Sequence, residues 1–155
     1  MIYLIIVIAA VAFDQITKYY AKLHLEGQAA YQIIPNFFSF EYVENRGAAF
    51  GIMQGKRIFF FVVTFIAIAI LLYIFITEYD SLKVYEKVFL SFFMAGILGN
   101  FIDRLFRGYV IDFISFKFGS YQYPCFNLAD SYMCVIMIMF IGYYFYRLIK
   151  DKNAK

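Results

Sequence analysis

The sequence has no tryptophan, one histidine and two cysteines among its 155 residues. A histidine-rich metal site needs several imidazoles, so His24 alone excludes one, and a Ser-His-Asp triad would have to use this single residue. Cys125 and Cys134 have no histidine or further cysteine near them in sequence, which favours a packing role over a disulfide or a metal site. We therefore expect neither a metal nor a cofactor.

Charge is also scarce. Charged residues make up 16% of the chain, against roughly 25% in an ordinary soluble domain. Hydrophobic residues make up 64% and the mean hydropathy is +0.71, which is the composition of a membrane protein. The net charge is only +3 and the basic residues are scattered, so the sequence gives no support for nucleic-acid binding. Without tryptophan, the 15 tyrosines are expected to supply the aromatic belt at the membrane surface.

Four apolar segments are long enough to cross a hydrocarbon core of roughly 30 Å. They predict transmembrane helices over about residues 2–23, 58–77, 85–105 and 127–148. Residues 1–13 resemble the core of a signal peptide, but no positively charged segment precedes them, which favours a first transmembrane helix. We expect residues 1–155 to form a single integral membrane domain.

Residues 25–57 interrupt this pattern with Pro35 and several glycines, and residues 38–44 alternate apolar with polar side chains like a half-exposed strand. Residues 108–125 are too short and interrupted to span the bilayer and should stay on the same side as residues 25–57. The expected fold is therefore an all-α membrane protein with four transmembrane helices and a small extracytoplasmic β-containing cradle between the first two. The basic tail after the last span favours cytoplasmic termini.

Two aspartates lie at the edge of apolar segments without an obvious partner. Asp112 has large apolar neighbours on both sides, and Asp130 comes just before the last apolar run. An ionised carboxylate is costly to bury, and two that share a site divide into one acid and one base around a water. We hypothesise that Asp112 and Asp130 form a hydrolytic dyad at the membrane surface. The simpler alternative for Asp130, a carboxylate favoured by the dipole of a helix N-terminus, does not explain Asp112.

Other polar residues are expected to gather on the same side of the membrane. Asp14 and Lys18 are four apart and share a helical face, although a plain ion pair that ends the first helix is a simpler interpretation. An amide, an acid and a guanidinium close the third span and could be functional or could form an interfacial cap. These three residues are Asn100, Asp103 and Arg104.

Two further asparagines belong to this set of polar residues. Asn45 offers a donor and an acceptor beside Gly47, whose small size permits a close backbone approach, although a tight turn would explain the glycines equally well. Asn127 is three residues before Asp130 and shares its helical face.

Five motifs in order resemble lipoprotein signal peptidase, also called signal peptidase II, the membrane aspartyl protease of bacteria. The resemblance covers almost the whole chain, and five motifs in order are far more specific than any one of them. The motifs are Asp14-Gln15-Ile16-Thr17-Lys18, Asn45-Arg46-Gly47-Ala48-Ala49-Phe50, Gly99-Asn100-Phe101-Ile102-Asp103-Arg104, Val110-Ile111-Asp112-Phe113 and Phe126-Asn127-Leu128-Ala129-Asp130-Ser131.

The resemblance implies that Asp112 and Asp130 are the catalytic pair. It also implies substrate-binding or supporting roles for Asn45, Gly47, Asn100, Arg104, Asn127, Asp14, Lys18 and Asp103.

The implied substrate is a prolipoprotein whose lipobox cysteine already carries diacylglycerol and which is cleaved on the amino side of that cysteine. The resemblance further implies contact with membrane lipids and inhibition by globomycin-type peptides. The implied location is the bacterial cell membrane, with both termini cytoplasmic and the site near the extracytoplasmic surface. We expect a monomer.

Two other functions fit some of these residues. Intramembrane acids and an arginine also mark ion pathways, so a small proton-coupled transporter is the leading alternative, but the acids gather near one surface and no internal repeat is visible. A lipid-head-group transferase or phosphatase would usually enlist histidine or a metal, and the chain has only His24.

Overall fold

The computed structural model of the chain describes residues 1–47 and 55–153. Residues 48–50 of the second motif therefore lie outside the described residues. Within the described part, four helices and four strands follow one another along the chain. They are α1 (Ile2–Leu25), β1 (Tyr31–Ile34), β2 (Phe38–Asn45), α2 (Arg57–Thr77), α3 (Val84–Phe106), β3 (Val110–Phe118), β4 (Tyr121–Gln122) and α4 (Leu128–Asn153).

The four helices are long and apolar enough to span a membrane, which confirms the predicted fold class. Their side chains face outward over most of their length, and α2 has no buried residue among those described. Such exposure of leucine, isoleucine and phenylalanine is stable when lipid covers it. Helix α1 continues past Asp14 and Lys18 to Leu25, so the ion pair does not end the helix and this simpler interpretation was wrong.

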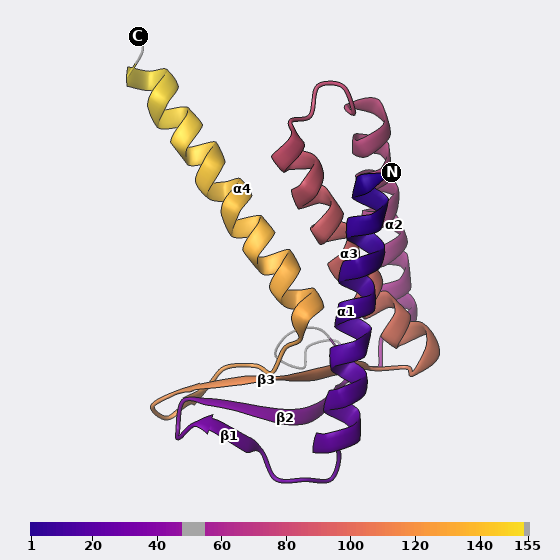
Figure 1. Cartoon of the computed structure of the whole chain (residues 1–155), viewed down its shortest axis with the longest axis vertical. Helices are drawn as coiled ribbons and strands as arrows, with labels where there is room; N and C mark the ends of the chain where they lie inside the picture. Colours follow the sequence, from indigo (N-terminus) through magenta and orange to yellow (C-terminus); the bar gives the residue numbers. More distant parts are fainter. Residues whose placement is uncertain (48–54, 154–155) are drawn as a thin grey trace.

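Helices α1, α2 and α3 lie side by side, while α4 starts near them and leans away toward its C-terminal end (Figure 1). The sheet lies across the end of the bundle at which α1 ends and α4 begins. The N-terminus and the C-terminal end of α4 lie at the opposite end. The polar connections that carry the predicted site residues thus meet at one end of the molecule.

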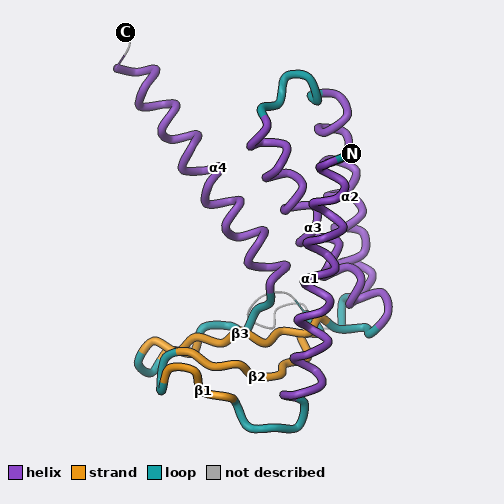
Figure 2. The backbone as a smooth tube through the Cα atoms, in the orientation of Figure 1, coloured by secondary structure: helices purple, strands orange, loops and turns teal. Residues whose placement is uncertain are grey.

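The strands, drawn in orange in Figure 2, come from two distant parts of the chain, residues 31–45 and 110–122. Their order in the sheet is β1-β2-β3-β4, and all neighbours are antiparallel. We predicted β structure only between the first two helices and treated residues 108–125 as a linker. That part of the prediction was wrong, because β3 and β4 come from this linker and β3 pairs along β2.

The burial of β3 explains why its sequence does not look like a surface strand. Val110, Ile111, Asp112 and Phe113 are all buried, so both faces of the strand are covered and the usual alternation is absent. Ile111 and Phe113 pack with Ala21 of α1 in an apolar core cluster. Val110 and Asp112 occupy the other face, because successive side chains of a strand alternate.

Candidate active site

Asp112 and Asp130 reach the site from different elements. Asp112 lies in β3 and is 2% exposed, and Asp130 lies in the first turn of α4 and is half-buried. The register of β2 on β3 pairs Val43 with Asp112 and Asn45 with Val110. Asn45 is therefore the diagonal neighbour of Asp112 on the same face of the sheet.

The Asn45 side chain is held at both ends. Its Oδ1 accepts a hydrogen bond from the Gly47 amide at 2.9 Å, which leaves Nδ2 to donate to Oδ2 of Asp112 at 2.9 Å. An amide oxygen fixed by a backbone N–H cannot exchange places with its nitrogen without losing that bond. The turn at Gly47 thus determines that a donor faces Asp112.

Asn127 is held in the same way by the start of α4. Its Oδ1 accepts from the Asp130 amide at 3.1 Å, and Oδ2 of Asp130 accepts from the Asn127 amide at 3.2 Å. This reciprocal pair is a capping box, with aspartate in the place usually taken by glutamate or glutamine. The cap turns Nδ2 of Asn127 toward Asp112, where it donates to Oδ1 at 2.6 Å.

Asn100 of α3 connects Asp130 to a buried cation. Its Oδ1 accepts from Lys18 Nζ at 2.9 Å and from Asn127 Nδ2 at 3.2 Å, and its own Nδ2 donates to Oδ1 of Asp130 at 2.7 Å. Three asparagines therefore donate N–H groups to two carboxylates. The side-chain oxygen of each asparagine accepts a hydrogen bond, which fixes the direction of its N–H donor. Such an arrangement keeps both carboxyl groups in fixed positions without neutralising them.

The protonation of Asp112 is poised near neutrality. Burial is the main cause that raises the pKa of Asp112 from its ordinary value of 3.8 to about 7, and the negative charge of Asp130 adds to the effect. The hydrogen bonds from Asn45 and Asn127 act in the opposite direction, because they stabilise the ionised form. A carboxyl group with this pKa can hold or release a proton at physiological pH.

A buried charge cluster adjoins the start of α4 from the helix side. Lys18 Nζ lies 2.8 Å from Asp14 Oδ2 and 3.1 Å from Asp103 Oδ2, and all three side chains are fully buried. Asp14 also accepts from the Ala129 amide at 3.0 Å, at the start of α4. The cluster therefore ties α1 and α3 to the turn of helix that carries Asp130.

Two polar residues of this cluster were not predicted from the sequence. Arg107 forms an ion pair with Asp103 and donates to Gln15 Oε1 at 3.2 Å, and Gln15 Nε2 donates to the Gly99 carbonyl at 3.1 Å. The four-residue spacing of Asp103 and Arg107 was the available signal.

Arg104 has a different environment from that of Asp103, its neighbour in sequence. Arg104 Nη2 donates to the Gly47 carbonyl at 3.3 Å, and its guanidinium lies 4.7 Å from the Phe60 ring centroid. It therefore ties α3 and α2 to the turn that orients Asn45. Every site residue predicted from the sequence thus lies either in the hydrogen-bonded group around Asp112 and Asp130 or in the adjoining charge cluster.

Two glycines of α3 allow this close packing. A methyl group on Gly99 would come within 2.5 Å of Asp14 Oδ2, and one on Gly96 would come within 2.5 Å of the Ala129 carbonyl oxygen. Real side chains do not approach this closely, so only glycine lets α1 and α4 meet α3 here.

A hollow of about 340 Å³ lies beside Asp130, lined by residues of the β4–α4 connection and the first turns of α4. Its wall is mostly apolar, and Asp130 is its charged group. Among the described residues, no group of three or more histidine, cysteine, aspartate or glutamate side chains is placed to hold a metal ion. Carboxyl and amide groups are what this site offers for chemistry.

Comparison with known proteins identifies the family of the chain. The family described as "Signal peptidase (SPase) II" matches residues 6–146. A protein named "Lipoprotein signal peptidase" from Staphylococcus aureus (strain JH9) is 38% identical over 152 residues, which cover 98% of this chain and 90% of the relative.

Two solved structures, each described as a bacterial membrane enzyme structure by the in meso method, share the fold. The one at 2.3 Å resolution has a TM-score of 0.80 and 37% identity, and the match covers 99% of this chain and 90% of that chain. The one at 1.9 Å resolution has a TM-score of 0.80 and 38% identity, and covers 92% and 91%. The protein described here belongs to the signal peptidase II family of bacterial membrane proteases.

Proposed function

We propose that this protein is an aspartic endopeptidase that removes the signal peptide from diacylglyceryl-modified prolipoproteins, on the amino side of the lipidated cysteine. The proposal rests on family membership and on one observation above all. Asp112 and Asp130 accept hydrogen bonds from the same residue, Asn127, which brings two carboxyl groups to one site. Two carboxyl groups at one site supply a base and an acid without a cofactor.

In the proposed reaction, the ionised aspartate takes a proton from a water molecule as the water oxygen attacks the scissile carbonyl. The protonated aspartate gives its proton to the carbonyl oxygen, and a tetrahedral diol forms. When the C–N bond breaks, the proton taken from the water passes to the leaving amine, and a proton of one diol hydroxyl returns to the second aspartate. The bond between carbon and nitrogen is thus replaced by one between carbon and the water oxygen, and the dyad returns to its starting state.

The asparagines keep the two carboxyl groups in position during this cycle. Asn45 and Asn127 hold Asp112 through both of its oxygens, and Asn100 holds Oδ1 of Asp130. Fixed donors favour whichever group carries negative charge and need no reorganisation when the charge moves between them. Arg104, Gly47, Asp14, Lys18 and Asp103 support the site by holding these donors and the start of α4.

The position of the dyad suits a lipidated substrate. The sheet crosses the end of the helix bundle, so a diacylglyceryl group held in the bilayer would present its cysteine at the depth of the carboxyl groups (Figure 1). The apolar hollow beside Asp130 offers room for a substrate side chain at that depth. An unlipidated peptide would lack the anchor that brings it there.

We further propose that the protein is a monomer in the bacterial cytoplasmic membrane, with its termini in the cytoplasm and its sheet outside. Membrane lipids surround it, and globomycin-type peptides inhibit it by occupying the dyad. The transporter alternative has no observation in its favour, because the carboxyl groups lie at the sheet end of the bundle.

The function is tested by incubating the purified protein in detergent with a synthetic prolipoprotein peptide whose lipobox cysteine carries diacylglycerol. We expect two products whose masses place the cut on the amino side of that cysteine. The same peptide without lipid should stay intact. Hydroxylamine in the reaction should trap no hydroxamate of the released signal peptide, because water attacks directly and no acyl-enzyme forms. Cleavage at another bond, equal cleavage of the unlipidated peptide, or a trapped hydroxamate would contradict the proposal.

A further inference from the structure

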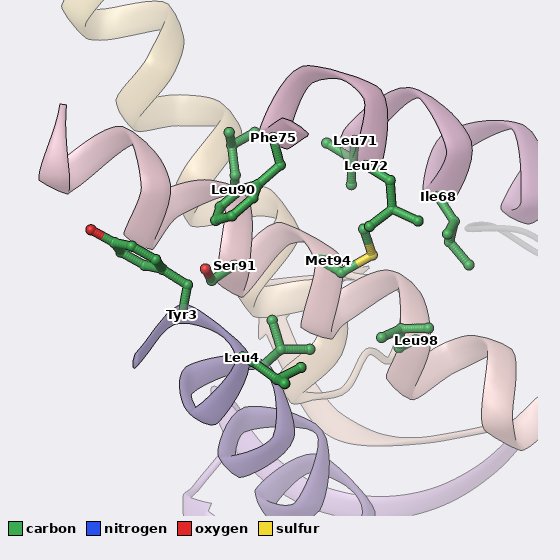
Figure 3. Close-up of a pocket in the computed structure, with 11 residues that line it drawn as sticks. Tyr3, Leu4, Ile68, Leu71, Leu72, Phe75, Leu90, Ser91, Met94 and Leu98 are labelled. Carbon is green, nitrogen blue, oxygen red and sulfur yellow. The ribbon is translucent and has the colours of Figure 1, made fainter. Parts of the chain in front are cut away.

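A second hollow lies far from the dyad, between the ends of α1, α2 and α3 that are remote from the sheet. It measures about 300 Å³, and its lining is almost entirely apolar. Figure 3 shows side chains of all three helices around it, among them Leu4 of α1, Leu72 of α2 and Met94 of α3. The lining side chains belong to membrane-spanning segments, so the hollow opens toward hydrocarbon and not toward water.

The hollow has the shape of a groove along the helices. On α3 its lining extends from Leu90 to Leu98, which at 1.5 Å per residue is roughly 12 Å along the helix axis. On α2 it extends over a similar length, from Ile68 to Phe75. An apolar groove of this length and direction matches part of a lipid acyl chain that runs from the membrane surface toward the bilayer centre.

The end of the groove that is farther from the sheet combines aromatic rings with a cation. The Tyr3 ring lies 5.7 Å from that of Phe75 and 6.3 Å from that of Tyr79, in edge-to-face contacts that join α1 to α2. Lys87 Nζ lies 3.9 Å from the centroid of the Tyr79 ring. Tyrosines and a lysine at this depth are the groups that contact lipid head groups.

The charge of Lys87 is available to a ligand. Among the side chains that the structure describes, no carboxylate oxygen lies within 4.0 Å of its ammonium. The neighbouring acids have other partners, since Glu78 accepts from the Ser81 hydroxyl and Glu86 accepts from the Lys83 amide. Lys83, one turn away, donates to the Tyr143 hydroxyl at 3.5 Å and contacts the ring of Tyr85. Only Lys87 of these two lysines is placed beside the aromatic end of the groove.

We propose that this groove binds one anionic phospholipid, with an acyl chain between α1 and α2 and the phosphate against Lys87. The site lies at the end of the bundle opposite the dyad, so it is separate from the place where a lipidated substrate would react (Figure 1). A bound lipid fills the space between α1 and α2, which meet at the ends remote from the sheet through the Tyr3 contacts. Zwitterionic lipids fit the same groove without the net attraction to the ammonium.

Native mass spectrometry of the detergent-purified protein tests this proposal, with phosphatidylglycerol and phosphatidylcholine of equal chain length added in competition. We expect one retained phosphatidylglycerol. In Lys87→Gln, its preference over phosphatidylcholine should fall about fivefold, because a lysine near an anionic head group contributes on the order of 1 kcal/mol. Lys83→Gln is the matched control and should keep the wild-type preference, because its ammonium faces Tyr143.

A second pair of variants tests the groove itself. Val7→Phe places a larger side chain in the groove and should abolish binding of both phosphatidylglycerol and phosphatidylcholine. Val63→Phe should leave binding unchanged, because this exposed position of α2 lies outside the lining. Melting temperature and cleavage of the lipidated peptide are measured for every variant, so a folding defect is separated from a binding defect. Equal behaviour of the two lysine variants, or retention of the lipid in a folded Val7→Phe protein, would overturn the site. A dimer mass in place of a lipid adduct would show that a second copy covers the groove.

Discussion

At the scale of single residues, Lys18 and Lys22 show how burial decides what a charge contributes. They lie one turn apart on α1, yet Lys18 is fully buried between Asp14 and Asp103, whereas Lys22 lies 42% exposed and 3.9 Å from Glu26. A buried cation that balances two carboxylates cannot be removed without leaving them unpaired. An exposed pair in water gains little from its attraction.

Replacing Lys18 by methionine should therefore destabilise the protein by about 3–5 kcal/mol, because Asp14 and Asp103 lose their shared cation. Lys22→Met is the matched control on the same helix, and its melting temperature should stay close to that of the wild type. The measurement is thermal unfolding in detergent at neutral pH. Similar melting temperatures for the two variants would show that the buried cluster contributes little.

The raised pKa of Asp112 predicts how stability depends on pH. Between its ordinary pKa of 3.8 and its folded pKa of about 7, the folded protein holds a proton that the unfolded chain releases. The free energy of unfolding should therefore fall as pH rises through this range, by up to about 1.4 kcal/mol per pH unit. Asp112→Asn removes this contribution, so the stability of the variant relative to the wild type should increase from pH 4 to pH 7. Parallel unfolding curves for the two proteins across these pH values would contradict the assignment.

The polar residues themselves could be identified from the sequence, but the partner of each residue could not always be predicted. The Asp14–Lys18 pair follows from helical spacing. Asp103 and Arg104 are adjacent in sequence, but neighbours point about 100° apart on a helix, and the partners of Asp103 are Lys18 and Arg107. The contact of Asn100 with Lys18 and Asp130 depends on how α1, α3 and α4 pack, which no local pattern contains.

At the scale of elements, glycine in α3 sets the distance between helices. Gly99 faces Asp14, and Gly96 faces the start of α4, while Gly142 of α4 has nothing within 4 Å of where a methyl group would lie. The same substitution can therefore have opposite effects on two helices of one protein.

Gly99→Ala should lower stability by about 1–3 kcal/mol, because the new methyl group would displace Asp14 from Lys18 and from the Ala129 amide. Gly142→Ala should be neutral or slightly stabilising, since alanine is the better helix former and the space is open. Melting temperatures and cleavage rates are compared for both variants. Equal tolerance of alanine at the two positions would mean that α1 and α3 are not held at the distance seen here.

The four helices could be predicted because a helix that crosses a bilayer needs a long apolar segment. Strand β3 could not be predicted from its own sequence. A strand covered on both faces loses the alternation that marks a surface strand, and its partner β2 is more than 60 residues away in sequence. The pairing of β2 with β3 is what places Asn45 beside Asp112. The part of the site that escaped prediction is therefore the part made by long-range strand pairing.

At the scale of the whole molecule, the two ends differ. The sheet, Asp112 and Asp130 occupy one end, and the start of α1, the end of α4 and the α2–α3 loop occupy the other (Figure 1). The proposed orientation puts the sheet end outside the cytoplasm.

Single cysteines test this orientation in a background where Cys125 and Cys134 are replaced by serine. Ser81→Cys lies in the α2–α3 loop, and Gln28→Cys lies between α1 and β1, and both positions are exposed. A membrane-impermeant maleimide added to intact spheroplasts should label the protein with cysteine at 28 and leave the one with cysteine at 81 unlabelled until the membrane is opened. The reverse pattern would invert the proposed topology.

The central claim is that Asp112 and Asp130 together perform the cleavage, and kinetics of the two asparagine variants test it most directly. The measurement is the rate of cleavage of the diacylglyceryl-modified peptide by the wild type, Asp112→Asn and Asp130→Asn, with Asp80→Asn in the α2–α3 loop as the control. Because each carboxyl group is needed as acid or base, we expect each variant to lose at least about a hundredfold in kcat while its melting temperature shows that it is folded, and the control to keep the wild-type rate. A folded Asp112→Asn or Asp130→Asn protein with near-normal turnover would contradict the two-aspartate mechanism.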